Sequence, residues 1–193
     1  MRMRRIRGCI GLGVLSFWIA GCPATGPVGD QNTNDNSDGG GTDVEAGVEI
    51  MIPNEGQNHV SVGQQATYEA NPPASGPHWS GAGIAPVAAG VYESVLEEEQ
   101  WVHNLEHGYV VLLYDCLGSC EPALIDDLQA IFGAAPPSEV FGTTKLVITP
   151  YDGLPLSFAV VAWDRQLHLD TLDQDAVLDF YGAHVDQGPE AVP

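Results

Sequence analysis

The stretch that decides the fold runs Tyr109-Val-Val-Leu-Leu-Tyr-Asp-Cys-Leu-Gly-Ser-Cys-Glu-Pro122. It opens with an uninterrupted apolar run, which is typical of a buried β-strand. Pro122 suits the first turn of a helix, and apolar residues then recur at helical spacing. The stretch therefore predicts a strand over Tyr109 to Tyr114 and a helix directly after it, with Cys116 and Cys120 at the junction.

Three more apolar segments and a second helical pattern follow this unit. The segments Lys145 to Pro150, Phe158 to Trp163 and Gln166 to Leu169 are predicted strands. A turn at Asp164-Arg165 joins the last two strands, and Asp173 is a predicted N-cap of the last helix. Strands joined through a helix should be parallel, whereas the short link to the next strands favours a hairpin.

The resulting order of elements is strand, helix, strand, strand, helix, which predicts an α/β fold in a single domain. This is the core order of a thioredoxin-like domain, and the cysteines stand where that fold keeps its redox pair. A generic α/β sandwich is the alternative.

The half of the domain that precedes Tyr109 is less regular. Val48 to Ile52 and His59 to Val62 are predicted short strands. Asn71 to Pro86 is rich in proline and glycine, so we expect an ordered, non-repetitive loop that packs over the core. A rigid loop of this kind can fix a side chain such as His78 at low entropic cost.

Histidine is concentrated in two segments, Asn71-Pro-Pro-Ala-Ser-Gly-Pro-His-Trp79 and Val102-His-Asn-Leu-Glu-His-Gly108. Acidic residues at 97–99 favour a helix N-terminus and Gly108 suits the residue after a helix C-terminus, so we expect a short helix ending at His107. In a helix His103 and His107 would lie ~6 Å apart, whereas in a strand they would be separated by about 13 Å.

Imidazole is the commonest metal ligand in proteins, so this spacing predicts a metal site. His103 and His107 would be completed by His78 or His59, with Glu106 as a ligand or as a base beside the ligands. Such a site would suit Zn²⁺ or Cu²⁺. The alternative is a structural polar network in which the histidines pin the proline-rich loop through hydrogen bonds.

The string His103-Asn-Leu-Glu-His107 also matches H-x-x-E-H, the zinc-binding pattern of the inverzincin peptidases. The short chain and the strand that begins directly after Gly108 argue against a peptidase. A Gly-rich phosphate loop and a G-x-S-x-G elbow are absent from the sequence as well. No reaction can therefore be assigned from these motifs.

Cys116 and Cys120 support a different hypothesis. In an oxidising compartment, a structural disulfide is the simplest expectation for this pair. Cys-x3-Cys followed by proline is also similar to the motif of Sco-type copper metallochaperones, which hold copper with two thiolates and a distant histidine. His168 or His103 would supply that histidine here, so thiol redox chemistry or copper transfer is the second functional hypothesis.

The first residues predict export and lipid anchoring. Four arginines precede an apolar run from Cys9 to Ile19, and Ala20-Gly21-Cys22 resembles the lipobox of bacterial lipoproteins. We expect a signal peptide over residues 1–21, a lipidated Cys22, a flexible tether over residues 22–43 and one globular domain over residues 44–193. The protein would then lie in the cell envelope, attached to a membrane and facing its extracytoplasmic side.

The charge of the chain excludes one class of partner. The sequence has 26 Asp and Glu against 6 Lys and Arg, and residues 1–21 contain four of those six. The mature chain would keep only Lys145 and Arg165, a formal charge of −24 (2 minus 26). Such a surface repels nucleic acid. The sequence names no protein partner.

Several blocks together carry a family resemblance. Besides the two histidine-rich segments, four shorter blocks carry it: Gly56-Gln-Asn-His59, Gly90-Val-Tyr92, Ala162-Trp163 and Gly188-Pro-Glu190. From about Glu55 to Glu190 the chain resembles an uncharacterised bacterial family of membrane-anchored, exported proteins, domain-of-unknown-function family 3105. The resemblance implies an exported, thioredoxin-like domain with no reaction assigned to it. It puts His59, His78, His103 and His107 in motif positions and leaves both core cysteines outside the pattern.

Overall fold

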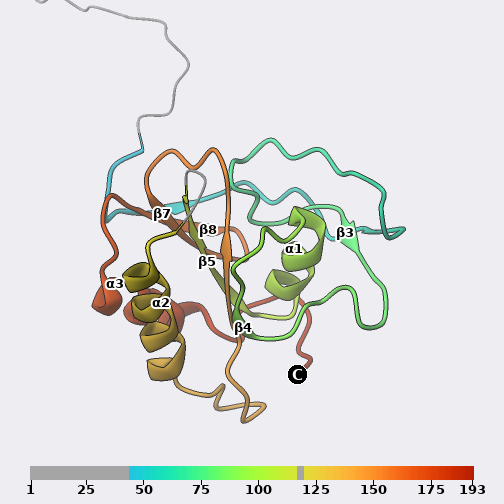
Figure 1. Ribbon diagram of the computed structural model, residues 1–193. Coiled ribbons are helices and arrows are strands. Elements are labelled where there is room, and N and C mark those ends of the chain that lie inside the picture. The colour runs from blue at the N-terminus through green and yellow to red at the C-terminus, as the bar shows by residue number, and fades with distance from the viewer. Residues whose placement is uncertain (1–43, 117–119) are drawn as a thin grey trace, which may run out of the picture. The chain divides into compact units, whose positions relative to one another are not determined.

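The computed structural model describes residues 44–116 and 120–193. The predicted signal peptide, Cys22 and the tether lie outside the described residues. The elements are, in chain order, β1 (Glu49–Met51), β2 (His59–Val60), β3 (His78–Trp79), β4 (Gly90–Val91), α1 (Glu98–Glu106), β5 (Val110–Tyr114), α2 (Pro122–Ala134), β6 (Leu146–Pro150), β7 (Phe158–Ala162), β8 (Arg165–Leu169) and α3 (Gln174–His184). The predicted α/β class is confirmed (Figure 1).

A mixed sheet with the strand order β1-β8-β7-β5-β6-β4 forms the centre of the domain. As predicted, β5 and β6 are parallel and are connected through α2. The predicted hairpin between β6 and the next strand is wrong, because β7 pairs antiparallel with β5 instead. β4 pairs with the other edge of β6. The chain that leaves β6 therefore crosses β5, and β7 pairs with the edge of β5 that faces away from β6.

β7 and β8 form the antiparallel hairpin that the sequence predicts. The turn lies one residue earlier than expected, at Trp163 and Asp164, and Arg165 is already the first residue of β8. Asp164 has a φ of 59°. Aspartate tolerates the left-handed conformation that a tight hairpin turn requires.

The central strands are buried on both faces, and their side chains alternate between two apolar clusters. Val110, Leu112 and Tyr114 of β5 face the cluster that contains apolar residues of α2 and α3. Val111 and Leu113 face the cluster that contains apolar residues of α1. We call these the two-helix face and the one-helix face of the sheet; Figure 1 shows the helices on opposite sides.

The proline-rich segment Asn71 to Pro86 is ordered, as expected, and Ala74, Ser75 and His78 within it are buried. Ala74 belongs to the cluster on the one-helix face, so this segment and α1 cover that face together. In the part of the chain that the structure describes, no helix is long and apolar enough to cross a membrane.

Candidate metal centre

Helix α1 carries two of the candidate ligands, and its ends lie where the sequence places them. Glu98 and Glu99 are in its first turn, and Gln100 Oε1 accepts a hydrogen bond of 3.1 Å from the Glu97 N–H. His107 is its C-cap, and Gly108 follows with a φ of 76°. A glycine in this left-handed conformation is a common helix terminator. His103 and Glu106 lie in the last turns before it, and both are buried.

The other two candidate ligands come from a small ribbon of two parallel strands, β2 and β3. In their register, His59 stands opposite His78. The backbone N–H of His78 donates to the Asn58 carbonyl over 3.0 Å, and that of Gly76 donates to the Gly56 carbonyl over 2.8 Å. α1 packs against β3, and this contact brings the ribbon histidines to the helix.

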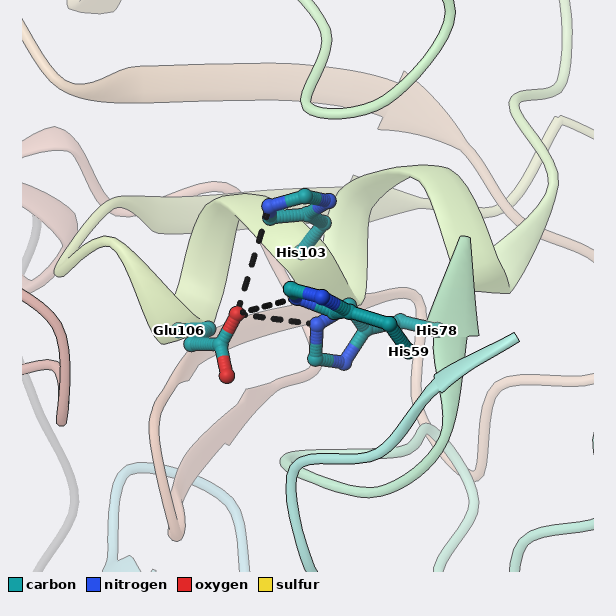
Figure 2. A group of neighbouring side chains, drawn as sticks. All are labelled: His59, His78, His103 and Glu106. Atoms are coloured by element: carbon teal, nitrogen blue, oxygen red, sulfur yellow. Dashed lines mark hydrogen bonds and ion pairs between the residues drawn. The ribbon is translucent and has the colours of Figure 1, made fainter. Parts of the chain in front are cut away.

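Four side chains converge at this contact, and we call them the His cluster: His59, His78, His103 and Glu106. Figure 2 shows the three imidazole rings gathered around one oxygen of Glu106. Oε2 of Glu106 lies 2.9 Å from His78 Nε2, 3.1 Å from His59 Nε2 and 3.9 Å from His103 Nε2. The carboxylate oxygen and three ring nitrogens therefore define one small volume.

Hydrogen bonds at the far side of two rings decide which nitrogen faces that volume. His78 Nδ1 lies 2.8 Å from the Gly76 carbonyl oxygen, and His103 Nδ1 lies 2.5 Å from that of Trp79. A carbonyl only accepts, so each Nδ1 carries the hydrogen and, in a neutral ring, Nε2 keeps its lone pair. A metal-binding histidine is oriented by the same pattern of outer hydrogen bonds.

Proton counting explains why this arrangement suits a cation. A neutral His78 with its hydrogen on Nδ1 has none on Nε2 to donate to an ionised Glu106. In these forms the 2.9 Å contact brings two acceptors together, and a proton or a cation between them would satisfy both. A metal ion at this point satisfies all the acceptors at once, whereas a proton satisfies only one pair.

The cluster is shielded from water on most sides. His78 is fully buried, Glu106 is 1% exposed and His103 is 4% exposed, whereas the side chain of His59 is 46% exposed. Burial lowers the pKa of His103, and burial together with the nearby His103 lowers the pKa of His107 to about 4. Both rings are therefore neutral near pH 7, which is the form that binds metals.

The distances agree with a four-coordinate ion. Zn²⁺ binds imidazole nitrogen and carboxylate oxygen at about 2.0–2.2 Å, which places the corners of a tetrahedron about 3.3 Å apart. The contacts of 2.9, 3.1 and 3.9 Å around Oε2 bracket that value. The ligand atoms of all four residues lie within 4.8 Å of one another.

His107, which the sequence assigns to the same site, lies next to the His cluster instead. Its Nε2 is 3.1 Å from His103 Nε2 and 3.6 Å from Glu190 Oε2. With Glu106 and Glu190 it forms a second group of potential metal ligands. Glu190 is not among the ligands expected from the sequence, although it belongs to the block Gly188-Pro-Glu190 that carries part of the family resemblance.

Cys116 and Cys120 form a disulfide. Both residues pack against the two-helix face, whereas His103 belongs to α1 on the opposite side. His168 alternates with Leu167 and Leu169, which face the two-helix side, so it points away from the cysteines as well. Within the described residues neither group of potential ligands contains a cysteine, so the structure does not bring together the thiol and histidine set expected for copper.

The fold and the His cluster together define a mixed α/β protein with a candidate metal centre between a helix and a two-stranded ribbon. The chain belongs to the family described as protein of unknown function (DUF3105), which matches residues 59–192. The match begins at His59 and includes Glu190, so it contains every candidate ligand described above. No curated protein and no solved structure matches the chain.

Proposed function

We propose that this protein is an exported lipoprotein that binds one transition-metal ion through His59, His78, His103 and Glu106. The observation that carries the proposal is the convergence of three imidazole nitrogens on one buried carboxylate oxygen. Burying a carboxylate and several imidazoles costs free energy unless each is satisfied. A cation compensates that cost for the three buried groups, His78, His103 and Glu106.

The ligand set favours Zn²⁺ or Cu²⁺. Imidazole suits both ions, and one carboxylate with three imidazoles matches the four-coordinate preference of zinc. Mg²⁺ and Ca²⁺ prefer oxygen ligands and are disfavoured here. The competing interpretation is a noncatalytic envelope protein in which the same residues form a structural network held by protons.

Metal analysis of the full-length protein tests the proposal. Protein purified in detergent is equilibrated with Zn²⁺ or Cu²⁺, dialysed against high salt and analysed for bound metal per chain. We expect retention of metal by the wild type and loss in His78→Ala and in Glu106→Gln. Cu²⁺ added to the wild type below one equivalent per chain should give an EPR spectrum with nitrogen hyperfine structure.

His184→Ala is the matched control for this experiment. His184 is the last residue of α3, and its Nε2 lies 3.2 Å from Glu49 Oε2. It belongs to neither group of potential ligands among the described residues. Its removal should leave metal retention unchanged. A wild type that retains no more metal than His78→Ala would refute the metal-binding proposal and leave the structural network.

Lipid anchoring is the second part of the proposal. It is supported by the basic and apolar residues before Cys22 and by the polar composition of residues 22–43. Cells grown with labelled palmitate should incorporate label into the wild type and not into Cys22→Ser. Equal labelling of both proteins would exclude acylation at this cysteine.

A second candidate function is thiol–disulfide exchange in a thioredoxin-like core. Two observations favour it: the strands follow the order β6-β5-β7-β8, and the half-buried Cys116–Cys120 disulfide lines a surface pocket with Glu93 and Pro150. A redox-active pair should equilibrate with glutathione buffers. A reduction potential below about −300 mV would instead identify a structural disulfide.

A further inference from the structure

We infer that the C-terminal segment builds a second metal position beside the His cluster, in which His107 and Glu190 are ligands and Glu106 bridges the two ions. The inference rests on the proposed function, because the bridge requires an ion in the His cluster. Glu106 belongs to both groups of potential ligands in the described chain, and in each group the ligand atoms lie within 4.8 Å of one another.

The segment that carries Glu190 is fixed to the end of α1 by its backbone. The Asp186 N–H donates to the Gly108 carbonyl over 2.9 Å, and the Glu190 N–H donates to the Glu106 carbonyl over 3.0 Å. The second bond satisfies a carbonyl in the last turn of α1, which the end of a helix leaves free. Glu190 is therefore held in register with the helix turn that contains Glu106 and His107.

Two glycines make this close approach possible. A Cβ at Gly188 would collide with the Glu106 carbonyl oxygen and with the Gly108 nitrogen. A Cβ at Gly108 would lie 2.8 Å from Asp186 Cα. The segment can lie against the helix end only because neither position carries a side chain.

A buried lysine directly before β6 also holds the C-terminal segment against the end of α1. Lys145 is fully buried, and its Nζ donates to the carbonyls of His107 over 2.9 Å and Val192 over 2.7 Å. The same atom lies 3.0 Å from Asp186 Oδ1. Burial of a charged lysine is costly unless it is paired, so this ion pair and these hydrogen bonds hold both ends of the segment in place.

The geometry around Glu106 fits two adjacent ions. A carboxylate has two oxygens and about four lone-pair sites, so Glu106 can bind one ion on each side. His103 Nε2 and His107 Nε2 lie 3.1 Å apart and belong to different groups. If each nitrogen binds the ion of its own group, the two ions would lie close together, in agreement with the usual spacing of about 3.5–4 Å in two-metal sites.

The second position differs from the first in the number of its protein ligands. Each position has one ligand that reaches solvent, since the side chain of Glu190 is 45% exposed and that of His59 is 46% exposed. Only three protein residues supply ligands at the second position, so a tetrahedral ion would keep a coordination place for water or a small anion. The His cluster, by contrast, supplies four protein ligands.

Counting ions per chain tests the inference in the full-length protein. With saturating Zn²⁺ followed by dialysis against high salt, we expect two ions in the wild type and one in Glu190→Gln. His107→Ala should also retain one ion, which provides a second variant if the first does not fold. Glu139→Gln, at an exposed acidic residue, should retain two.

The outcomes separate this inference from the proposed function. One ion in the wild type, lost in His78→Ala, would refute the second position and leave the first. No ion in the wild type would refute both. Two ions in both the wild type and Glu190→Gln would place the second ion elsewhere and refute the inference. With Cu²⁺, the wild type should show magnetic coupling by EPR that Glu190→Gln abolishes.

Discussion

The two faces of the sheet are built from the same strands and yet have different contents. The two-helix face is lined by apolar side chains from α2, α3 and alternate strand residues. The one-helix face has an apolar cluster too, but buried polar residues gather on its side, including His78, His103, Asn104 and Glu106.

This difference suggests that the two faces have different roles, one in stabilising the fold and the other in binding. Apolar burial stabilises the fold without further requirements, whereas buried polar groups stabilise it only when every one of them is satisfied. A protein under selection for stability alone would gain by replacing the polar residues of the one-helix face with apolar ones. Their presence supports the proposal that this face binds a metal ion, and the following predictions test that division.

The largest expected effect is on stability, from truncation of the two-helix face. Ile148 is fully buried in β6 within that cluster, so Ile148→Ala should lower the free energy of unfolding by about 2–5 kcal/mol. Ile84→Ala removes the same atoms from a side chain that is 42% exposed and should cost much less. Urea unfolding measures both. Folded Ile148→Ala should retain metal as the wild type does; a loss of metal would contradict the division.

The second effect is stabilisation by metal through the one-helix face. An ion that binds only the folded state at 100 times its dissociation constant stabilises it by about 2.7 kcal/mol. Zn²⁺ should therefore raise the urea midpoint of the wild type, and a chelator should reverse the change. His78→Ala should show no such rise, whereas His184→Ala should behave as the wild type. An equal rise in His78→Ala would place the stabilising ion outside the His cluster.

Local sequence signals predicted the parts of this site that depend on neighbouring residues. Acidic residues at the start of the helix and Gly108 after it located α1, and helical spacing then placed His103 and His107 one turn apart, although the structure assigns them to different groups of potential ligands. The helix propensities, caps and periodicities involved act over a few residues. For the same reason α2 begins at Pro122, as the sequence indicates.

Contacts between distant segments were not predictable in this way. The β2–β3 pairing that sets His59 against His78 depends on the fold of the intervening loop, and the pairing of β7 with β5 depends on which sheet edges are already occupied. Glu190 is one of 26 acidic residues in the chain. Its backbone bond to the Glu106 carbonyl and its contact with His107 identify it as a potential ligand, and neither contact has a local signature in the sequence.

The third prediction concerns the disulfide on the two-helix face. Cys116 and Cys120 are separated by four positions, and closing so short a loop stabilises a folded chain by about 2 kcal/mol in the chain-entropy view. Replacing both cysteines with serine should lower the free energy of unfolding by up to that amount. Metal retention should not change, because the cysteines and the His cluster lie on opposite faces. Loss of metal in the double variant would instead link the two faces.

The smallest effect is expected at the start of α3, which covers the two-helix face. Asp173 is its N-cap, and its Oδ1 accepts a hydrogen bond of 3.1 Å from the Ala176 N–H. Asp173→Ala removes that acceptor and should cost about 1 kcal/mol, within a usual range of about 0.5–2. Asp173→Asn removes only the charge and keeps an oxygen in place, so its unfolding curve should lie close to that of the wild type. Equal destabilisation by the two substitutions would show that α3 depends on the charge at its N-terminus rather than on the cap. Because α3 contacts the sheet opposite the His cluster, neither variant should alter metal retention, and a change there would show that the two faces are coupled even for a small perturbation.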